Sequence, residues 1–209
     1  SRYWNWLISA AQGEFGFSRI HNRPVLEILG PRLANTFLLM GSSLLLALIL
    51  AIPMGVYSAI RPQSRSDFAI NIFALGGTSI PLFWLALILI VVFSVWLEWL
   101  PSSALYEHDA SLLSKVRHMI LPVFALSLAT VGPLTRHMRA AMIEVLKHDY
   151  IRTAHAKGLG ERRVVINHAL RNAMIPVVTV LSLSFGSLFS GALITETMFS
   201  YLGTGKLIF

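Results

Sequence analysis

The stretch LANTFLLMGSSLLLALILAIPMGVYSAI, residues 33–60, carries no charged side chain over the 28 positions between Arg32 and Arg61. A helix crosses a bilayer with about 20 mostly apolar residues, so this stretch predicts a membrane span. Three more runs, of 30, 17 and 24 residues, lack Asp, Glu, Lys, Arg and His. We therefore expect four spans, at about 33–58, 69–96, 119–138 and 173–195.

The composition of the whole chain favours a membrane protein. Of its 209 residues, 55% are apolar and only 13% are charged, and the mean hydropathy is +0.67. Soluble domains carry about 25% charged residues, so soluble and intrinsically disordered proteins are excluded, and the lack of cysteine excludes a disulfide scaffold. The expected fold is an all-α bundle of transmembrane helices, kinked by prolines within the spans: Pro53, Pro81, Pro122, Pro133 and Pro176.

The basic residues indicate how the spans are oriented. Segments 59–68 and 136–172 lie on one side of a four-span protein and hold ten of the 17 Lys and Arg residues. The positive-inside rule makes that side cytoplasmic, which accounts for the net charge of +7 without nucleic acid as a partner. The remaining segments are then outside: 1–32, 97–118 and 196–209. The first of them is expected to lie partly on the membrane surface, with Pro31 just before the first span.

The basic segment 136–172 carries a helical pattern. Apolar residues recur every four positions and would share one helical face: Met142, Leu146, Tyr150 and Ala154. Gly158 and Gly160 then interrupt the pattern, as glycines at the end of a helix do. The expected structure is a helix, a tight turn and a second helix, which either docks into a groove on a soluble partner or only connects two spans.

Small residues are spaced four apart on the last span, at Ser182, Gly186 and Ser190. Such spacing lets helix backbones approach closely. We interpret this face as a helix-packing surface, either within the chain or against a partner subunit.

Motifs for other chemistry are absent from the sequence. It has no phosphate-binding loop, no H-E-x-x-H and no G-x-S-x-G, and its histidines lack metal-ligand spacing, so neither catalytic nor metal-binding residues are expected. An intramembrane enzyme would need ionisable groups deep in the spans, and a channel would need polar rings. Glu196, near an outer end, is interpreted as an interfacial carboxylate.

Residues 149–159, DYIRTAHAKGL, resemble the cytoplasmic motif of permease subunits in binding-protein-dependent ABC importers, in particular the dipeptide, oligopeptide and nickel branch. Similar motifs occur at residues 33–36, 79–84 and 196–199. The resemblance implies the type I ABC importer permease (MetI-like) fold over residues 33–209, with a coupling loop at 139–171. Family members generally have six spans, so the first and last are expected to be missing from this sequence.

The resemblance also implies which residues act. A coupling helix at about 152–160 would sit in a cleft of an ATPase subunit, where Gly158 allows a tight turn and Ala154 permits close contact. Arg152, Lys157 and Arg162 would reach acidic groups on the ATPase. The full set expected to couple to the ATPase is Asp149, Tyr150, Arg152, Thr153, Ala154, Lys157, Gly158 and Leu159.

The implied function is transport rather than catalysis. The chain would form half of the pathway of an ATP-driven importer for di- and oligopeptides, with nickel or another small solute as the alternative cargo. The expected partners are a second homologous permease, two ATPase subunits, an extracytoplasmic substrate-binding protein and membrane lipid. No cofactor is expected in this chain, because ATP and Mg would bind the ATPases. The location would be the prokaryotic plasma membrane, crossed several times.

Overall fold

The computed structural model describes residues 2–19, 22–105 and 111–208. They form a bundle of helices with one short antiparallel hairpin near the N-terminus, in which Phe17 pairs with Pro24 and Ser18 with Arg23. The elements are α1 (Arg2–Ala11), β1 (Phe17–Ser18), β2 (Arg23–Pro24), α2 (Val25–Ile60), α3 (Arg65–Ser79), α4 (Leu82–Ile90), the π-helical η1 (Val91–Trp96), α5 (Leu112–Leu146), α6 (Asp149–Ala156), α7 (Glu161–Arg163), the π-helical η2 (Val164–Leu170), α8 (Arg171–Met198) and α9 (Gly205–Ile208).

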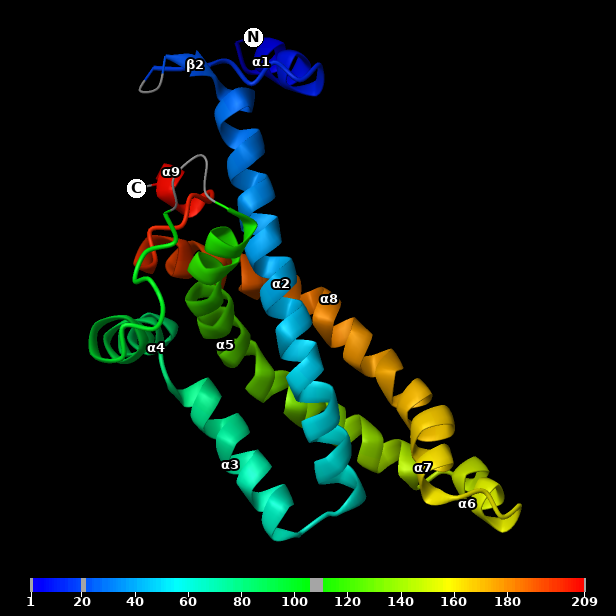
Figure 1. The fold of residues 1–209 in the computed structure, drawn as a ribbon. Coiled ribbons are helices and arrows are strands. Elements are labelled where there is room, and N and C mark those ends of the chain that lie inside the picture. Colours follow the sequence, from blue (N-terminus) through cyan, green and yellow to red (C-terminus); the bar gives the residue numbers. More distant parts are fainter. Residues whose placement is uncertain (1, 20–21, 106–110, 209) are drawn as a thin grey trace.

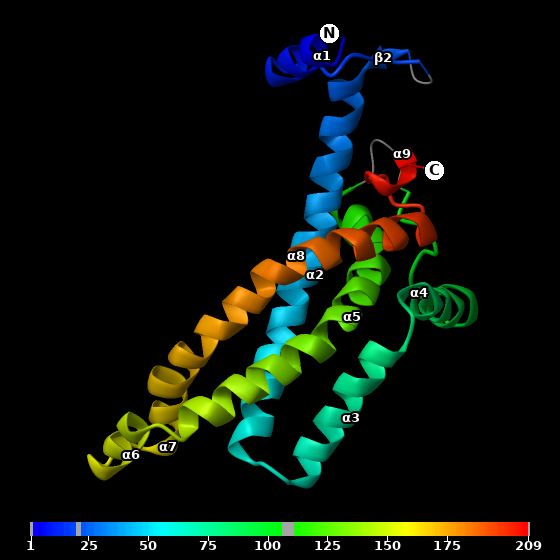
Figure 2. The same ribbon diagram turned by 180° about the vertical axis from the view of Figure 1, so that it is seen from behind.

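Long apolar helices build the bundle. Within the described residues, three helices are long and apolar enough to cross a membrane: α2, α5 and the continuous run of α7, η2 and α8. Figures 1 and 2 show α2 and α5 running together from the end near α9 to the end near α6 and α7, with α8 returning. Buried apolar residues follow α2 and α5 along this length, among them Leu39, Ala47, Leu126, Leu134 and Met142.

Helix α2 is longer than the span predicted at 33–58. Helix α2 begins at Val25 and therefore contains Pro31. From the sequence alone, Pro31 was expected to lie just before the first span. Residues 25–30 are mostly apolar and helix-compatible, and a long helix tolerates a proline when neighbouring groups satisfy the freed carbonyl. The boundary placed at residue 32 therefore falls within a helix.

The stretch predicted as one span at 69–96 is broken in the structure. Helix α3 meets the α4–η1 helix at an angle of 100°. The cause is Pro81, which has no backbone N–H and forces the preceding Ile80 out of the helical region, to φ −87° and ψ 122°. The predicted kink at Pro81 is thus a sharp bend, whereas the other predicted kink prolines lie inside α2, α5 and α8. The two helices reach the length and hydropathy of a span only as a pair, and the span at 69–96 stays a prediction.

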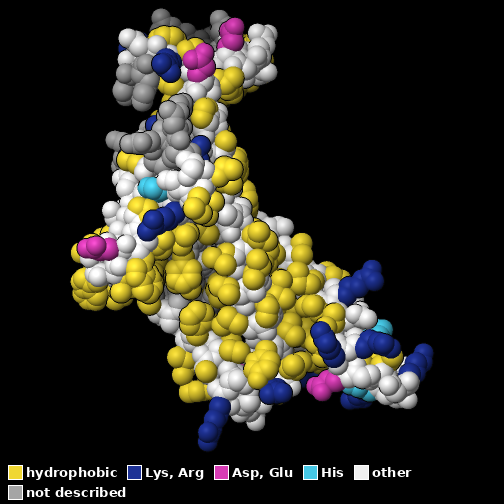
Figure 3. Space-filling model, in the orientation of Figure 1, with side chains coloured by type: hydrophobic (Ala, Val, Ile, Leu, Met, Phe, Trp, Pro, Cys, Tyr) yellow, Lys and Arg dark blue, Asp and Glu magenta, His cyan; other side chains and the backbone are white. Residues whose placement is uncertain are grey.

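One end of the bundle is basic. There the α2–α3 connection (residues 61–64) and the α6–α7 hairpin project beyond the apolar helices (Figure 1). Figure 3 shows hydrophobic side chains over the middle of this face and Lys and Arg side chains gathered around α6 and α7. We call this the basic end, and the end with the chain termini the opposite end.

Candidate functional site

The hairpin at the basic end starts with a break in the helix. Helix α5 ends at Leu146, and His148 is extended, with φ −71° and ψ 150°. The predicted face with four-residue spacing from Met142 to Ala154 is therefore not one face, because two separate helices carry it. The acidic residue in the first turn of α6, Asp149, lies where the helix dipole favours a negative charge.

The end of α6 is a Schellman turn centred on Gly158. Gly158 has φ +77°, and its N–H donates to the His155 carbonyl at 2.9 Å, while the Leu159 N–H donates to the Ala154 carbonyl at 3.3 Å. Only glycine adopts this left-handed conformation readily, so the predicted tight turn at Gly158 is present. Gly160 has a different role, since with φ −64° it precedes the first residue of α7.

The inner face of α6 is buried against its own chain. Ile151 is 3% exposed and Ala154 6%, in one apolar cluster with Val145 of α5 and Val164 of η2. Ala154 thus faces its own chain, and the expected close contact with a partner stays a prediction. A hydrogen bond of 3.2 Å from Asn172 Nδ2 to the hydroxyl of Tyr150 also ties α6 to the start of α8.

The outer face of α6 is exposed and polar, and it carries the cations Arg152 and Lys157. An ion pair between Arg152 and Asp149, 3.4 Å long, joins side chains that are 80% and 93% exposed, so it contributes little to stability. Seven of the predicted residues are arranged around this face. Asp149, Tyr150, Arg152, Thr153, Lys157 and Gly158 are exposed, and Leu159 is half-buried.

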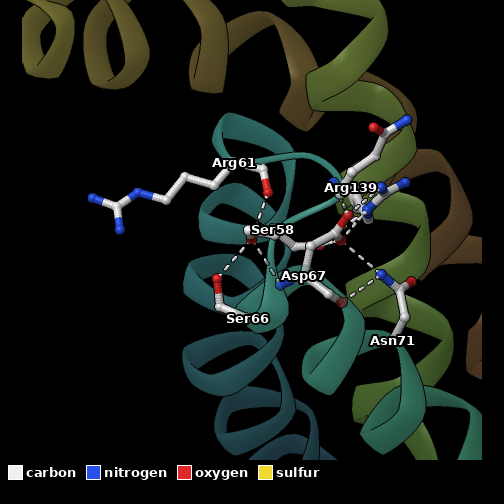
Figure 4. A network of polar contacts seen from close by, with 8 residues as sticks. Ser58, Arg61, Ser66, Asp67, Asn71 and Arg139 are labelled. Carbon is white, nitrogen blue, oxygen red and sulfur yellow. Dashed lines mark hydrogen bonds and ion pairs between the residues drawn. The ribbon is translucent and has the colours of Figure 1, made fainter.

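A buried polar network joins the end of α2 and the start of α3 to α5 (Figure 4). Arg139 of α5 binds Asp67 of α3 with two parallel hydrogen bonds, Nε to Oδ1 and Nη2 to Oδ2, both 2.8 Å long. Asp67 also accepts hydrogen bonds from the Gln63 backbone N–H at 2.9 Å, from Asn71 Nδ2 at 2.7 Å and from the Ser58 hydroxyl of α2. The carboxylate of Asp67 is 6% exposed and the Arg139 side chain 27%.

This geometry can be compared with known proteins. Residues 51–209 match the family described as binding-protein-dependent transport system inner membrane component. The chain belongs to this family. The match covers the last ten residues of α2 and α3 to α9, and so includes both the α6 hairpin and the Asp67–Arg139 pair. The chain is accordingly a multi-pass component of the inner membrane.

The relatives of this chain are named as transport proteins. The chain is 44% identical, over 99% of its length, to the oligopeptide transport system permease protein AppB of Bacillus subtilis, and it covers 66% of that protein. It is 38% identical, over 99% of its length, to the glutathione transport system permease protein GsiC of Escherichia coli K12, of which it covers 65%. The chain thus spans about two thirds of the length of these relatives.

A second polar network lies at the opposite end of the chain, around Glu196. Its carboxylate accepts hydrogen bonds from the Thr36 hydroxyl at 2.5 Å and from the Gly205 backbone N–H at 2.6 Å. Glu196 is fully buried, so its interpretation as an interfacial carboxylate is wrong. The chain beyond α8 folds back over the carboxylate, and Gly203 permits this because a side-chain carbon there would overlap Glu196.

The face of small residues on α8 is exposed in the described chain. Ser182, Gly186 and Ser190 are exposed, and a carbon added at Gly186 would meet nothing within 4 Å. Only 17% of the apolar window of this helix is buried, against 50% for α5. Helix packing by this face, either within the protein or against a partner subunit, stays a prediction.

The sequence did not identify Asp67, Arg139 and Glu196 as site residues. Asp67 bounds the uncharged run 68–97, and Arg139 is one of the basic residues of segment 136–172, although Asp67 is also the single acidic residue of segment 59–68. That isolated acid in a basic segment was the available signal. Among residues 2–19, 22–105 and 111–208, no three His, Cys, Asp or Glu side chains form a group that could hold a metal ion.

Proposed function

We propose that this chain is a permease subunit that forms half of the translocation pathway of an ATP-driven importer for di- and oligopeptides. Membership of the transport family supports the transport role. The relatives named for oligopeptide and glutathione transport support peptides as the cargo, since glutathione is itself a small peptide. These names favour peptides over nickel, and no group of metal ligands within the described residues supports a metal cargo.

The observation that carries this proposal is the two-faced α6 helix. On its inner face, Ile151 and Ala154 belong to one apolar cluster with residues of α5 and η2. Its outer face presents Arg152 and Lys157 to solvent. A helix that is anchored on one side and presents Arg152 and Lys157 on the other is suited to a groove with acidic groups on a soluble partner. Helix α6 is accordingly the coupling helix, and the basic end is cytoplasmic.

The remaining partners follow from this arrangement. Two ATPase subunits bind ATP and Mg and close on α6, and the movement reaches the bundle through α5 and η2. The exposed face of α8 at Ser182, Gly186 and Ser190 packs against a second, homologous permease. A substrate-binding protein delivers peptide at the opposite end. This scheme is a two-state equilibrium biased by ATP and by the loaded binding protein.

The test is purification of the full-length protein from its native membrane, followed by mass spectrometry of what accompanies it. The expected result is a second permease and an ATPase. The complex is then reconstituted in proteoliposomes with the binding protein encoded beside it, and uptake of tritiated trialanine is measured with and without ATP. A lone chain that recruits no ATPase would refute the proposal.

Two glycine variants of the hairpin sharpen this test. Gly158→Val places a β-branched residue at φ +77° and should abolish ATP-dependent uptake without preventing insertion. Gly160→Ala, at φ −64° with open space around it, is the matched control and should import normally. Equal uptake by both variants would contradict the role of α6.

A further inference from the structure

The Asp67–Arg139 network joins three segments that are far apart in the sequence. Ser58 lies near the end of α2, Asp67 in the first turn of α3, and Arg139 about two turns before the end of α5. The three segments meet where α2 and α3 are joined, and Figure 4 shows the side chains of Ser58, Asp67 and Arg139 close together there.

The network is built for fixed geometry more than for net stability. Asp67 accepts hydrogen bonds from two nitrogens of Arg139, from the hydroxyl of Ser58, from the backbone of Gln63 and from the amide of Asn71. Parallel hydrogen bonds between a guanidinium and a carboxylate fix the relative orientation as well as the distance. Buried ion pairs contribute little net stability after desolvation, so orientation is the property that this pair supplies best.

Helix α6 packs against η2, and η2 packs against α5. Met138, Met142 and Val145 of α5 belong to the same apolar cluster as Ile151 and Ala154 of α6. Arg139 lies within this stretch of α5, directly after Met138. A displacement of α6 therefore acts, through η2 and this cluster, on the part of α5 that holds the ion pair.

Helix α3 lies against α5 beyond the ion pair as well. A side-chain carbon at Gly132 of α5 would overlap the backbone carbonyl oxygen of Ala74, and one at Gly77 of α3 would lie 3.3 Å from the Leu128 carbonyl. These contacts are between backbones and cannot yield as flexible side chains do. Helix α3 then ends at the 100° bend before α4, so a shift of α5 is passed toward that bend.

We propose that Asp67 and Arg139 are positioning residues that make the ends of α2, α3 and α5 one mechanical unit, so that movement of the coupling helix α6 reaches the bend between α3 and α4. This inference rests on the proposed function. It adds that the ion pair sets how much peptide is moved per ATP, while neither residue touches peptide or nucleotide.

The experiment uses the full-length permease reconstituted with its partner permease, ATPases and binding protein. The variant is D67N/R139Q, which removes both charges and leaves neither one buried alone. The matched control is R136Q, which removes an exposed positive charge from the same helix, one turn earlier. The readouts are the amount of assembled complex, ATP hydrolysis, and uptake of tritiated trialanine per ATP hydrolysed.

The expected result is that D67N/R139Q assembles and hydrolyses ATP but imports about 2- to 30-fold less trialanine per ATP, the range for residues that carry coupling. The R136Q control should keep the parental ratio. A parental ratio in D67N/R139Q would overturn the inference while leaving the proposed function intact. Failure of the parent complex to import or to bind ATPase would instead overturn the proposed function.

A second variant keeps the test decisive if the double variant does not assemble. R139K keeps the positive charge but cannot form the two parallel hydrogen bonds. It should assemble at the parental level and import less trialanine per ATP. A parental ratio in R139K, with D67N/R139Q failing to assemble, would show that the pair only stabilises the fold and would overturn the inference.

Discussion

Replacement of Gly132 by alanine tests the close approach of α3 and α5. The added carbon would overlap the carbonyl oxygen of Ala74 and lie 3.2 Å from Thr78 Cγ2. Because a backbone oxygen cannot turn aside, the two helices must separate. A gap of about 0.5–1 Å forfeits a quarter to a half of each van der Waals contact across the interface, and overpacking of this kind costs about 1–3 kcal/mol.

A matched substitution isolates this packing term. Gly186→Ala also places alanine in a long apolar helix, but there the added carbon meets nothing within 4 Å. Both substitutions gain about 0.8–1 kcal/mol of helix propensity, so the propensity gain cancels in the comparison. G132A should therefore be less stable than G186A by the packing cost alone, about 1–3 kcal/mol.

The assay is thermal unfolding of the full-length variants in detergent, followed by near-UV circular dichroism at a fixed scan rate. For a chain of this size, the packing cost corresponds to a midpoint about 2–12 °C lower for G132A than for G186A. A midpoint for G132A equal to or above that of G186A would refute the close backbone contact between α3 and α5.

Three further predictions concern the hairpin, the buried carboxylate and the face of α8. Gly158→Ala forces alanine to φ +77°, which costs about 1–2 kcal/mol, so limited tryptic cleavage of the hairpin should be about 5- to 30-fold faster than in Gly160→Ala. Glu196→Gln leaves one acceptor oxygen where two accept hydrogen bonds now, so unfolding should become easier by about 1–3 kcal/mol. Gly186→Leu should leave the isolated subunit folded but reduce recovery of the second permease, measured by quantitative mass spectrometry.

Each of these predictions has an opposing outcome. Equal cleavage rates for the Gly158 and Gly160 variants would mean that the turn relaxes without the glycine. A thermal midpoint of E196Q at the parental value would show that the carboxylate is not needed as a double acceptor. Undiminished pairing of G186L would remove the exposed α8 face from the interface between permeases.

The features that the sequence predicts well are local ones. Runs without charge reveal the long helices, because the cost of placing a charge in lipid acts on every residue of a span. The turn at Gly158 is also local, since a left-handed residue at a helix end favours glycine irrespective of the rest of the fold. The prediction of one helical face from Met142 to Ala154 was wrong, because the apolar residues keep their four-residue spacing across the break at His148.

The features that the sequence missed depend on distant partners. Asp67 and Arg139 are 72 positions apart, and Thr36 and Glu196 are 160 apart. In the sequence, each residue of these pairs looks like an ordinary polar residue near the end of a span. The size of the bend at Pro81 is likewise set by the packing of α4 against α5 and α8, whereas the proline itself only shows that the helix is interrupted.

The bend after α3 has a consequence for hydration. A helix end leaves about four carbonyl groups without partners in the helix, and here they fall around Gly77 and Ser79, between two apolar helices. The hydroxyls of Thr78 and Ser79 donate to the Leu75 carbonyl at 2.8 and 3.0 Å, one turn before the end of the helix. Carbonyl oxygens accept hydrogen bonds from water and from any peptide N–H alike. The interrupted helix thus places main-chain acceptors, which do not discriminate between side chains, within the uncharged run of residues 68–97.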